Sequence, residues 1–144
     1  MNIYFGGSIS GGREHVGTYK KLIEFIRGFG NVLTEHIGDR SLTVEGGEDY
    51  DARYIHDRDL QWLGSADIMI AEVSTPSLGV GYEIAKAVQM KKNVLCLYHP
   101  RQGMRLSSMI TGCPGVTVAE YTTLEEAKKA IHHFIRRAEH QEMR

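Results

Sequence analysis

The chain has 144 residues, 42% of them hydrophobic, and a formal net charge of −1. This length forms one domain over residues 1–144, and its apolar content fills a core without disulfides or a metal. The balanced charge predicts neither nucleic acid nor a membrane as partner, and no run approaches the roughly 18 apolar residues of a membrane span. Only Cys96 and Cys113 are cysteines. Two cysteines and no secretory pattern predict a cytoplasmic protein.

Short apolar runs alternate with amphipathic ones, the pattern of strands joined by crossover helices. In chain order the sequence predicts a strand at 2–5, a helix at 15–28, a strand at 31–33, a surface loop at 36–49, a helix at 50–64, a strand at 67–73, a helix at 79–90, a strand at 93–98, one helical turn at 106–110, a strand at 116–118 and a helix at 123–141. We expect an open, mostly parallel α/β sheet. In such sheets ligands bind beyond the carboxyl ends of the strands.

Glycine is in excess, with 16 of 144 residues against an average of about 7%. One cluster, Gly6-Gly7-Ser8-Ile9-Ser10-Gly11-Gly12, follows the first predicted strand and precedes a helix. Backbone N–H groups in such a loop can turn toward an anion at the helix amino terminus. The loop matches neither the dinucleotide fingerprint nor the Walker sequence. A tight turn without ligand and a phosphate loop both stay open, and Arg13 is either a phosphate ligand or a surface group.

A second loop, Ser74-Thr75-Pro76-Ser77-Leu78-Gly79-Val80-Gly81, ends a buried strand and opens a helix. Its hydroxyls stand where a helix N-cap is expected, and capping explains one serine. Capping does not explain Gly79 and Gly81, since each glycine in a helical turn weakens it by roughly 1 kcal/mol. Close approach of a ligand to this turn is the more economical explanation.

Two carboxylates share the apolar stripes of their helices. Asp59 lies four residues after Ile55 and three before Trp62, whereas Asp57 and Arg58 are expected to point elsewhere. Glu83 lies three residues after Val80 and four before Ala87. An inward carboxylate is paired, hydrogen-bonded or catalytic. A structural partner and a catalytic role are both open for each.

The surroundings predict different charge states for the two carboxylates. Glu83 is expected in the first turn of its helix, where the dipole favours the ionised form that a nucleophile needs. Asp59 is expected beside an apolar wall formed by Trp62, which favours the protonated form of a general acid. In a retaining glycosidase two such carboxyl groups lie roughly 5–5.5 Å apart.

The same residues carry a resemblance to a known family. Over about residues 2 to 112 the chain resembles the nucleoside 2-deoxyribosyltransferase family, and within it the branch that hydrolyses 2′-deoxynucleoside 5′-monophosphates. The motifs that carry the resemblance are Tyr4-Phe5-Gly6-Gly7-Ser8-Ile9, Leu33-Thr34-Glu35-His36, Ile55-His56-Asp57-Arg58-Asp59-Leu60, and Ala71-Glu72-Val73 with Pro76-Ser77-Leu78-Gly79-Val80-Gly81-Tyr82-Glu83. The resemblance implies a flavodoxin- or Rossmann-like open parallel five-stranded sheet with helices on both faces, and a homodimer that needs no cofactor. It also implies cleavage of an N-glycosidic bond, which yields a free base and 2-deoxyribose 5-phosphate.

The resemblance also assigns roles to residues. Glu83 matches the nucleophile that forms a covalent deoxyribosyl intermediate, and Asp59 matches the acid/base. Tyr4 matches the tyrosine that orients the nucleophile and crowds the sugar 2′ position. The hydroxyls matched to binding of the 5′-phosphate are those of Ser8, Ser77 and, from the adjoining subunit, Ser107. The other expected substrate contacts are Gly6, Ile9, Ser10, Gly11, Gly12, Arg13, Gly79 and His36, of which His36 lies near the sugar and base.

The chain departs from the family at Ser10, where the relatives carry a basic residue. Either Arg13 supplies that charge, or hydroxyls and backbone N–H groups hold the phosphate, or phosphate recognition is weaker. A deoxyribosyltransferase and a non-catalytic nucleotide-binding module are the competing interpretations. No metal site is expected, because the seven histidines lack zincin spacing and the cysteines lie far apart.

Overall fold

The computed structural model describes residues 1–8, 16–34 and 51–142. Strands and helices alternate in the order β1 (Asn2–Gly7), α1 (Val16–Ile26), β2 (Asn31–Val32), α2 (Ala52–Ser65), β3 (Ile68–Glu72), α3 (Leu78–Gln89), β4 (Asn93–Tyr98), α4 (Ser108–Thr111), β5 (Val116–Glu120) and α5 (Leu124–Glu142). Each predicted strand and helix is present, and its ends lie within two residues of the predicted ones. The predicted loop at 36–49 lies outside the described residues.

In the part of the chain that the structure describes, all strand pairs are parallel, and the sheet has the order β2-β1-β3-β4-β5. This is the flavodoxin-like order, so the predicted fold class is confirmed. The order reverses between β1 and β3, which pair directly from Ile3 with Ile68 to Gly7 with Glu72. Ligands in such sheets bind outside the carboxyl ends of the strands at this switch point. The site is therefore expected beside Gly7 and Glu72.

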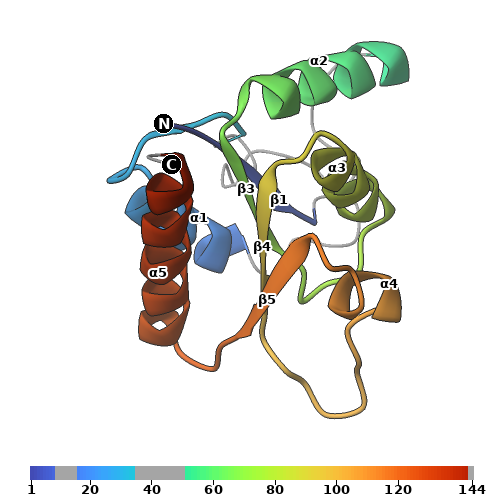
Figure 1. Cartoon of the computed structure of the whole chain (residues 1–144). Helices are drawn as coiled ribbons and strands as arrows, with labels where there is room; N and C mark the ends of the chain where they lie inside the picture. The colour runs from blue at the N-terminus through green and yellow to red at the C-terminus, as the bar shows by residue number, and fades with distance from the viewer. Residues whose placement is uncertain (9–15, 35–50, 143–144) are drawn as a thin grey trace.

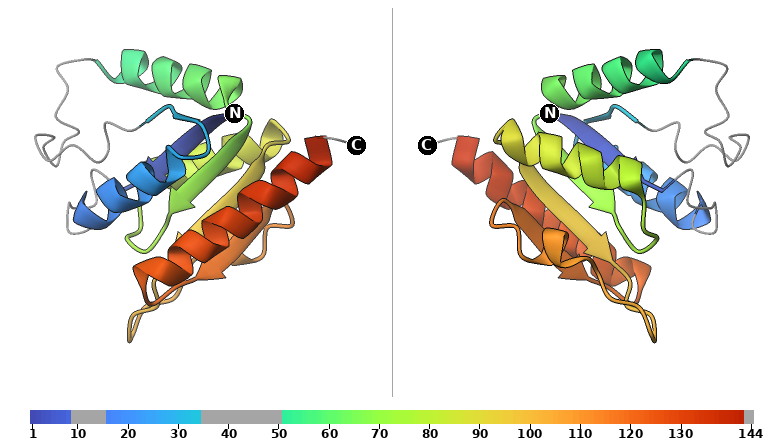
Figure 2. Two further views of the ribbon diagram at one scale, coloured as in Figure 1. Left: turned by 90° about the vertical axis from the view of Figure 1, so that its left-hand side faces the viewer. Right: turned by 90° about the vertical axis from the view of Figure 1, so that its right-hand side faces the viewer.

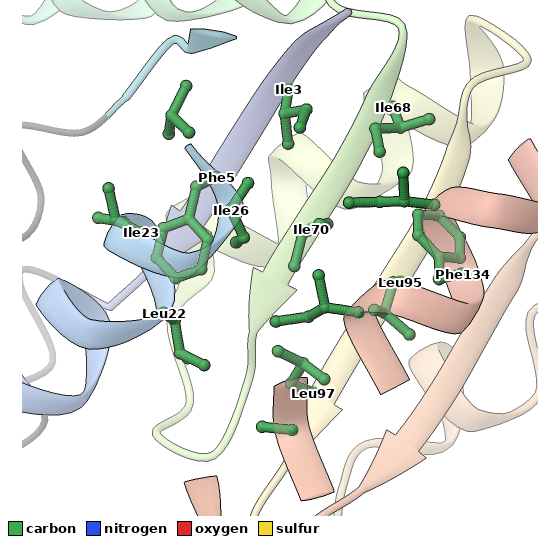
Figure 3. Packing of buried hydrophobic residues seen from close by; sticks show 14 of the residues in the cluster. Ile3, Phe5, Leu22, Ile23, Ile26, Ile68, Ile70, Leu95, Leu97 and Phe134 are labelled. Carbon is green, nitrogen blue, oxygen red and sulfur yellow. The ribbon is translucent and has the colours of Figure 1, made fainter. Parts of the chain in front are cut away.

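Helices cover both faces of the sheet (Figure 1). Helices α1 and α5 lie on one face, and α2, α3 and α4 lie on the other, as the two side views show (Figure 2). The core under α1 and α5 contains Ile3, Phe5, Leu22, Ile26, Ile68, Ile70, Leu95, Leu97 and Phe134 (Figure 3). The opposite core contains Tyr4, Leu63, Met69, Ala71, Val80, Ile84 and Cys96. Successive strand residues point to opposite faces, so Tyr4 is directed toward α3 while Ile3 and Phe5 face α1.

The longest helix, α5, is amphipathic. Ala127, Ile131, Ile135 and Ala138 recur at helical spacing and are buried against the sheet. Glu125 and Glu126 stand in its first turn, where they complement the helix dipole. Within the described ranges no helix has both the length and the apolarity to span a membrane.

Candidate active site

The phenol of Tyr4 meets the carboxylate of Glu83. Tyr4 is 1% exposed on the interior strand β1, and its hydroxyl donates a hydrogen bond to Oε2 of Glu83. Helix α3 brings Glu83 to this point because it begins directly after β3, the neighbour of β1. The Ser77 hydroxyl caps α3 by accepting a hydrogen bond from the Val80 N–H at 3.3 Å. The structure thus brings together two residues that the sequence assigned to one site.

The environment of Glu83 differs from the sequence expectation. Because α3 begins at Leu78, Glu83 is its sixth residue, and no acidic residue stands in the first turn. The dipole acts mainly within that first turn, so the argument for an ionised Glu83 was wrong. Burial instead raises the pKa of Glu83 from 4.5 to about 7. The hydrogen bond from Tyr4 favours the carboxylate form and works against this burial.

Asp59 has a cation beside it instead of an apolar wall. Arg58 donates to its Oδ1 from Nε at 3.1 Å and from Nη2 at 3.0 Å. The same guanidinium lies 4.7 Å above the ring of Trp62, and the Arg58 side chain is only 14% exposed. Arg58 therefore does not point away from the stripe, and the predicted apolar environment of Asp59 was wrong.

A hydrogen bond links the helices that carry the two carboxylates. Nε2 of His56 on α2 lies 2.9 Å from the hydroxyl of Tyr82 on α3. His56 stands three residues before Asp59, and Tyr82 immediately precedes Glu83. Nδ1 of His56 lies 2.9 Å from Oδ1 of Asp57, which orients the ring. The sequence did not predict this link, because it depends on how α2 packs against α3.

The three candidate phosphate-binding serines differ in exposure. Ser8 is 2% exposed immediately after β1, and Ser77 is half-buried at the start of α3. They follow neighbouring strands, β1 and β3, so both stand at the switch point. Ser107 is exposed and caps α4 by accepting from the Met109 N–H at 3.2 Å.

The glycines fall into two kinds. Gly6 and Gly7 belong to β1, and a Cβ there would lie 3.2 Å from Cε of Met69 and 3.0 Å from the ring of Tyr19. Packing within the protein therefore explains these two, and the expected ligand loop does not begin at Gly6. At Gly81 a Cβ would meet nothing within 4 Å, and at Gly79 only the Ser77 hydroxyl at 3.9 Å. Packing against the described residues therefore does not explain these two glycines, and the close approach of a ligand stays a prediction.

An apolar groove runs along α3. It has a volume of about 820 Å³ between α3 and residues 104–113, and Ser77 and Ser107 both line it. Leu78 is 96% exposed and Met109 82% exposed at its rim. The groove therefore adjoins two candidate phosphate-binding serines, but Glu83 is not part of its lining.

Several predicted contacts cannot be placed. The candidates outside the described residues are Ile9, Ser10, Gly11, Gly12, Arg13 and His36. Among the residues that are described, no group of three or more His, Cys, Asp or Glu side chains could hold a metal ion.

Comparisons with known proteins agree with the family resemblance. The family model described as nucleoside 2-deoxyribosyltransferase matches residues 3–142. The 5-hydroxymethyl-dUMP N-hydrolase of Danio rerio is 53% identical over 112 residues, which cover 78% of each chain. The 5-hydroxymethyl-dUMP N-hydrolase of Mus musculus is 43% identical over 137 residues, which cover 92% of this chain and 79% of the relative.

A solved structure shares the fold. The CMP N-glycosidase of Clostridium botulinum superposes with a TM-score of 0.65 at 17% identity, over 92% of this chain and 99% of that one. At this low identity the likeness concerns the fold alone.

Proposed function

The chain belongs to the nucleoside 2-deoxyribosyltransferase family and is an N-glycosidase, as predicted, and we propose that it hydrolyses 2′-deoxyribonucleoside 5′-monophosphates. The products are a free base and 2-deoxyribose 5-phosphate. The observation that carries the proposal is the contact between the Tyr4 hydroxyl and the half-buried carboxylate of Glu83. 5-Hydroxymethyl-dUMP is the first substrate to test, since two relatives are named for it.

The reaction proceeds in two displacements at the anomeric carbon. An oxygen of ionised Glu83 forms a bond to C1′ while the bond from C1′ to the base nitrogen breaks, and Asp59 gives a proton to the departing base. Water then attacks C1′, passes a proton to Asp59, and releases Glu83 as a carboxylate. Partial burial of Glu83 weakens the solvation of its carboxylate, which makes the ionised group a stronger nucleophile, and Tyr4 holds its Oε2 in place.

Arg58 constrains how Asp59 takes part. The guanidinium holds Oδ1 through two hydrogen bonds, so we assign the proton exchange to Oδ2. Because the guanidinium is planar and its donors have fixed directions, it also orients the Asp59 carboxyl group. The link between His56 and Tyr82 supports a shared site, because it holds α2 against α3 next to both carboxylates.

The sugar phosphate is assigned to the carboxyl ends of β1 and β3. Ser8 and Ser77 supply hydroxyls there, and the open space at Gly79 and Gly81 admits a ligand close to the backbone. Gly11, Gly12, Arg13 and Ser10 are assigned to the same phosphate on the resemblance alone. Tyr4 excludes a ribose 2′-hydroxyl by occupying the space beneath the sugar.

We also propose a cytoplasmic homodimer in which Ser107 of the partner subunit completes each phosphate site. What supports it is the uncovered apolar groove beside Ser77, with Leu78 and Met109 exposed at its rim. Water contact with so much apolar surface is unfavourable, and a second copy would remove it.

The test is incubation with a panel of deoxynucleotides and a matching ribonucleotide, with and without an unrelated free base. Chromatography is expected to show base release from the deoxynucleotides alone and no new nucleotide. A new nucleotide formed with the added base would identify a transferase instead. Binding of deoxynucleotides without any base release would identify a nucleotide-binding module.

A further inference from the structure

Glu72 is a buried carboxylate that the proposed reaction does not use. It ends β3 with 1% of its surface exposed. Ile68 and Ile70 of the same strand face α1 and α5, so Glu72, two residues further, lies on that face and not on the face of Glu83. A charged group in such a place requires hydrogen-bonding partners.

Three hydrogen bonds reach the Glu72 carboxylate. The backbone N–H of Ser74 donates to Oε1 at 2.7 Å, and the Ser74 hydroxyl donates to Oε2 at 2.9 Å. The hydroxyl of Tyr121, which directly follows β5, also donates to Oε2. Burial and the negative charge of Glu72 raise the pKa of Tyr121, so its phenol remains a donor at neutral pH.

The end of β4 joins the same network. The backbone N–H of His99 donates to the Ser74 hydroxyl at 2.8 Å, and His99 Nδ1 lies 2.9 Å from the carbonyl oxygen of Tyr121. Ser74 is thereby bonded to Glu72 at the end of β3 and to His99 after β4, and Tyr121 after β5 joins the network through those two residues. The backbone and the side chain of Ser74 are both engaged.

This anchoring leaves little freedom to the connection between β3 and α3. Ser74 is fixed at one end and Ser77 caps α3 at the other, so only Thr75 and Pro76 lie between them. Proline restricts its own φ and the conformation of the residue before it. Displacement of Ser74 would therefore move the hydroxyl of Ser77 with it.

We propose that the Glu72–Ser74–Tyr121 network is a positioning device that sets the place of Ser77 for the substrate's 5′-phosphate. The inference rests on the proposed function, because that function assigns Ser77 to the phosphate. Stability alone is a weak reason for such a network, since hydrophobic residues of similar volume often replace buried charges without loss. The Glu72 carboxylate accepts hydrogen bonds from Ser74 and from Tyr121 at once, and it thereby fixes the geometry of the loop after β3.

The experiment compares Tyr121→Phe and Ser74→Ala with wild type on a deoxynucleotide and on the deoxynucleoside with the same base. Each variant loses one hydroxyl and retains Glu72. KM for the deoxynucleotide is expected to rise about three- to tenfold in Tyr121→Phe, which removes one hydrogen bond, and at least as much in Ser74→Ala, whose hydroxyl makes two. The turnover number on the deoxynucleotide, and both kcat and KM on the deoxynucleoside, should stay within about twofold of wild type.

Two controls separate positioning from general weakening of the fold. Ile131→Val trims the core on the same face of the sheet and should leave KM unchanged. In Ser77→Ala the phosphate contact is already absent, so adding Tyr121→Phe should raise KM no further. Three results would overturn the inference. KM could rise equally for the deoxynucleotide and the deoxynucleoside, or Tyr121→Phe could raise KM further in the Ser77→Ala background. Ile131→Val could also raise KM for the deoxynucleotide as much as Tyr121→Phe does.

Binding of 2-deoxyribose 5-phosphate, followed by calorimetry, distinguishes this inference from the proposed reaction. If wild type binds it but releases no base, the proposed hydrolysis fails, and weaker binding by Tyr121→Phe still supports the positioning role. If wild type does not bind it, or if Tyr121→Phe binds it as well as wild type, the positioning role is refuted.

Discussion

The hydroxyl of Tyr4 donates a hydrogen bond to Glu83 across 79 positions of the sequence, from the interior strand β1 to the second turn of α3. The bond joins β1 to the helix that follows β3, and β1 and β3 are the two strands between which the order of the sheet reverses. It brings a rigid phenol, held by the strand, against the one carboxylate in the described residues whose pKa burial brings to about 7.

Replacing Tyr4 with phenylalanine is expected to lower the turnover number while retaining the preference for deoxyribose. The substitution removes one hydrogen bond to a charged group, worth about 1.5–3 kcal/mol, which corresponds to a loss of roughly 10- to 100-fold. The ring that crowds the sugar stays in place. Steady-state kinetics on a deoxynucleotide and its ribonucleotide measure both effects.

Tyr98→Phe is the matched control for that variant. Tyr98 belongs to the same core, and its hydroxyl donates to the carbonyl oxygen of Met104 at 3.4 Å, away from Glu83. Loss of the Tyr98 hydroxyl should leave the turnover number unchanged. Retained turnover in Tyr4→Phe together with lost sugar selectivity would contradict the orienting role of the Tyr4 hydroxyl.

The pH profile of kcat/KM reports which carboxyl group attacks. As nucleophile, Glu83 must be ionised, and its pKa of about 7 means that activity should fall as the pH drops below about 7. As general acid, Glu83 would need its proton, and activity would fall as the pH rises above 7. Values of kcat/KM measured between pH 5 and 9 distinguish the two roles. If kcat/KM does not fall as the pH drops below about 7, nucleophilic attack by Glu83 is contradicted.

The Glu83→Gln variant should be more stable than wild type at alkaline pH. Below about pH 4.5 the carboxyl is neutral in both the folded and the unfolded chain. From 4.5 to 7 the unfolded chain releases the proton that the folded chain retains, so the free energy of unfolding falls as the pH rises. The full penalty, up to about 3 kcal/mol, applies above 7 and is absent in the glutamine variant.

Urea unfolding at pH 4.5 and at pH 8 measures that difference. The gain in stability should appear at pH 8 and vanish at pH 4.5. A gain of the same size at both pH values would mean that desolvation of the Glu83 charge is not its cause.

How far the sequence predicts the structure depends on the range of the forces involved. The alternating apolar runs from Asn2 to Tyr98 predict strands and helices to within two residues, because they report only on which face is buried. Helical spacing likewise places Glu83 and Asp59 on inward faces. It does not predict that Arg58 bends back over Trp62, since a long side chain can reach beyond the direction of its Cα–Cβ bond.

Tertiary relationships account for the remaining differences. The strand β1 extends through Gly6 and Gly7 because these residues pair with Ala71 and Glu72 of β3, which lie elsewhere in the sequence. The partner of Glu72 in the buried network, Tyr121, is 49 residues away and meets it only once β5 has joined the sheet. A charged residue at the end of an apolar strand is the one local signal that marked Glu72.

A mixing experiment tests the shared active site of the proposed homodimer. Ser107→Asp keeps a good N-cap on α4 but places a negative charge against the phosphate, and Glu83→Gln removes the nucleophile. Each variant alone should be inactive. After subunit exchange, mixed dimers contain one intact site, and about a quarter of wild-type activity should return. Mixing without any recovery, at concentrations where dimers form, would contradict a site that includes Ser107 of the partner subunit.

Base release from a 2′-deoxynucleoside 5′-monophosphate, measured by chromatography for wild type and for Glu83→Gln side by side, tests the central claim most directly. Wild type should release free base and 2-deoxyribose 5-phosphate in equal amounts, and the variant should release neither above background while it remains folded. Equal release of base by the two proteins would contradict the assignment of Glu83 as the nucleophile of an N-glycosidase.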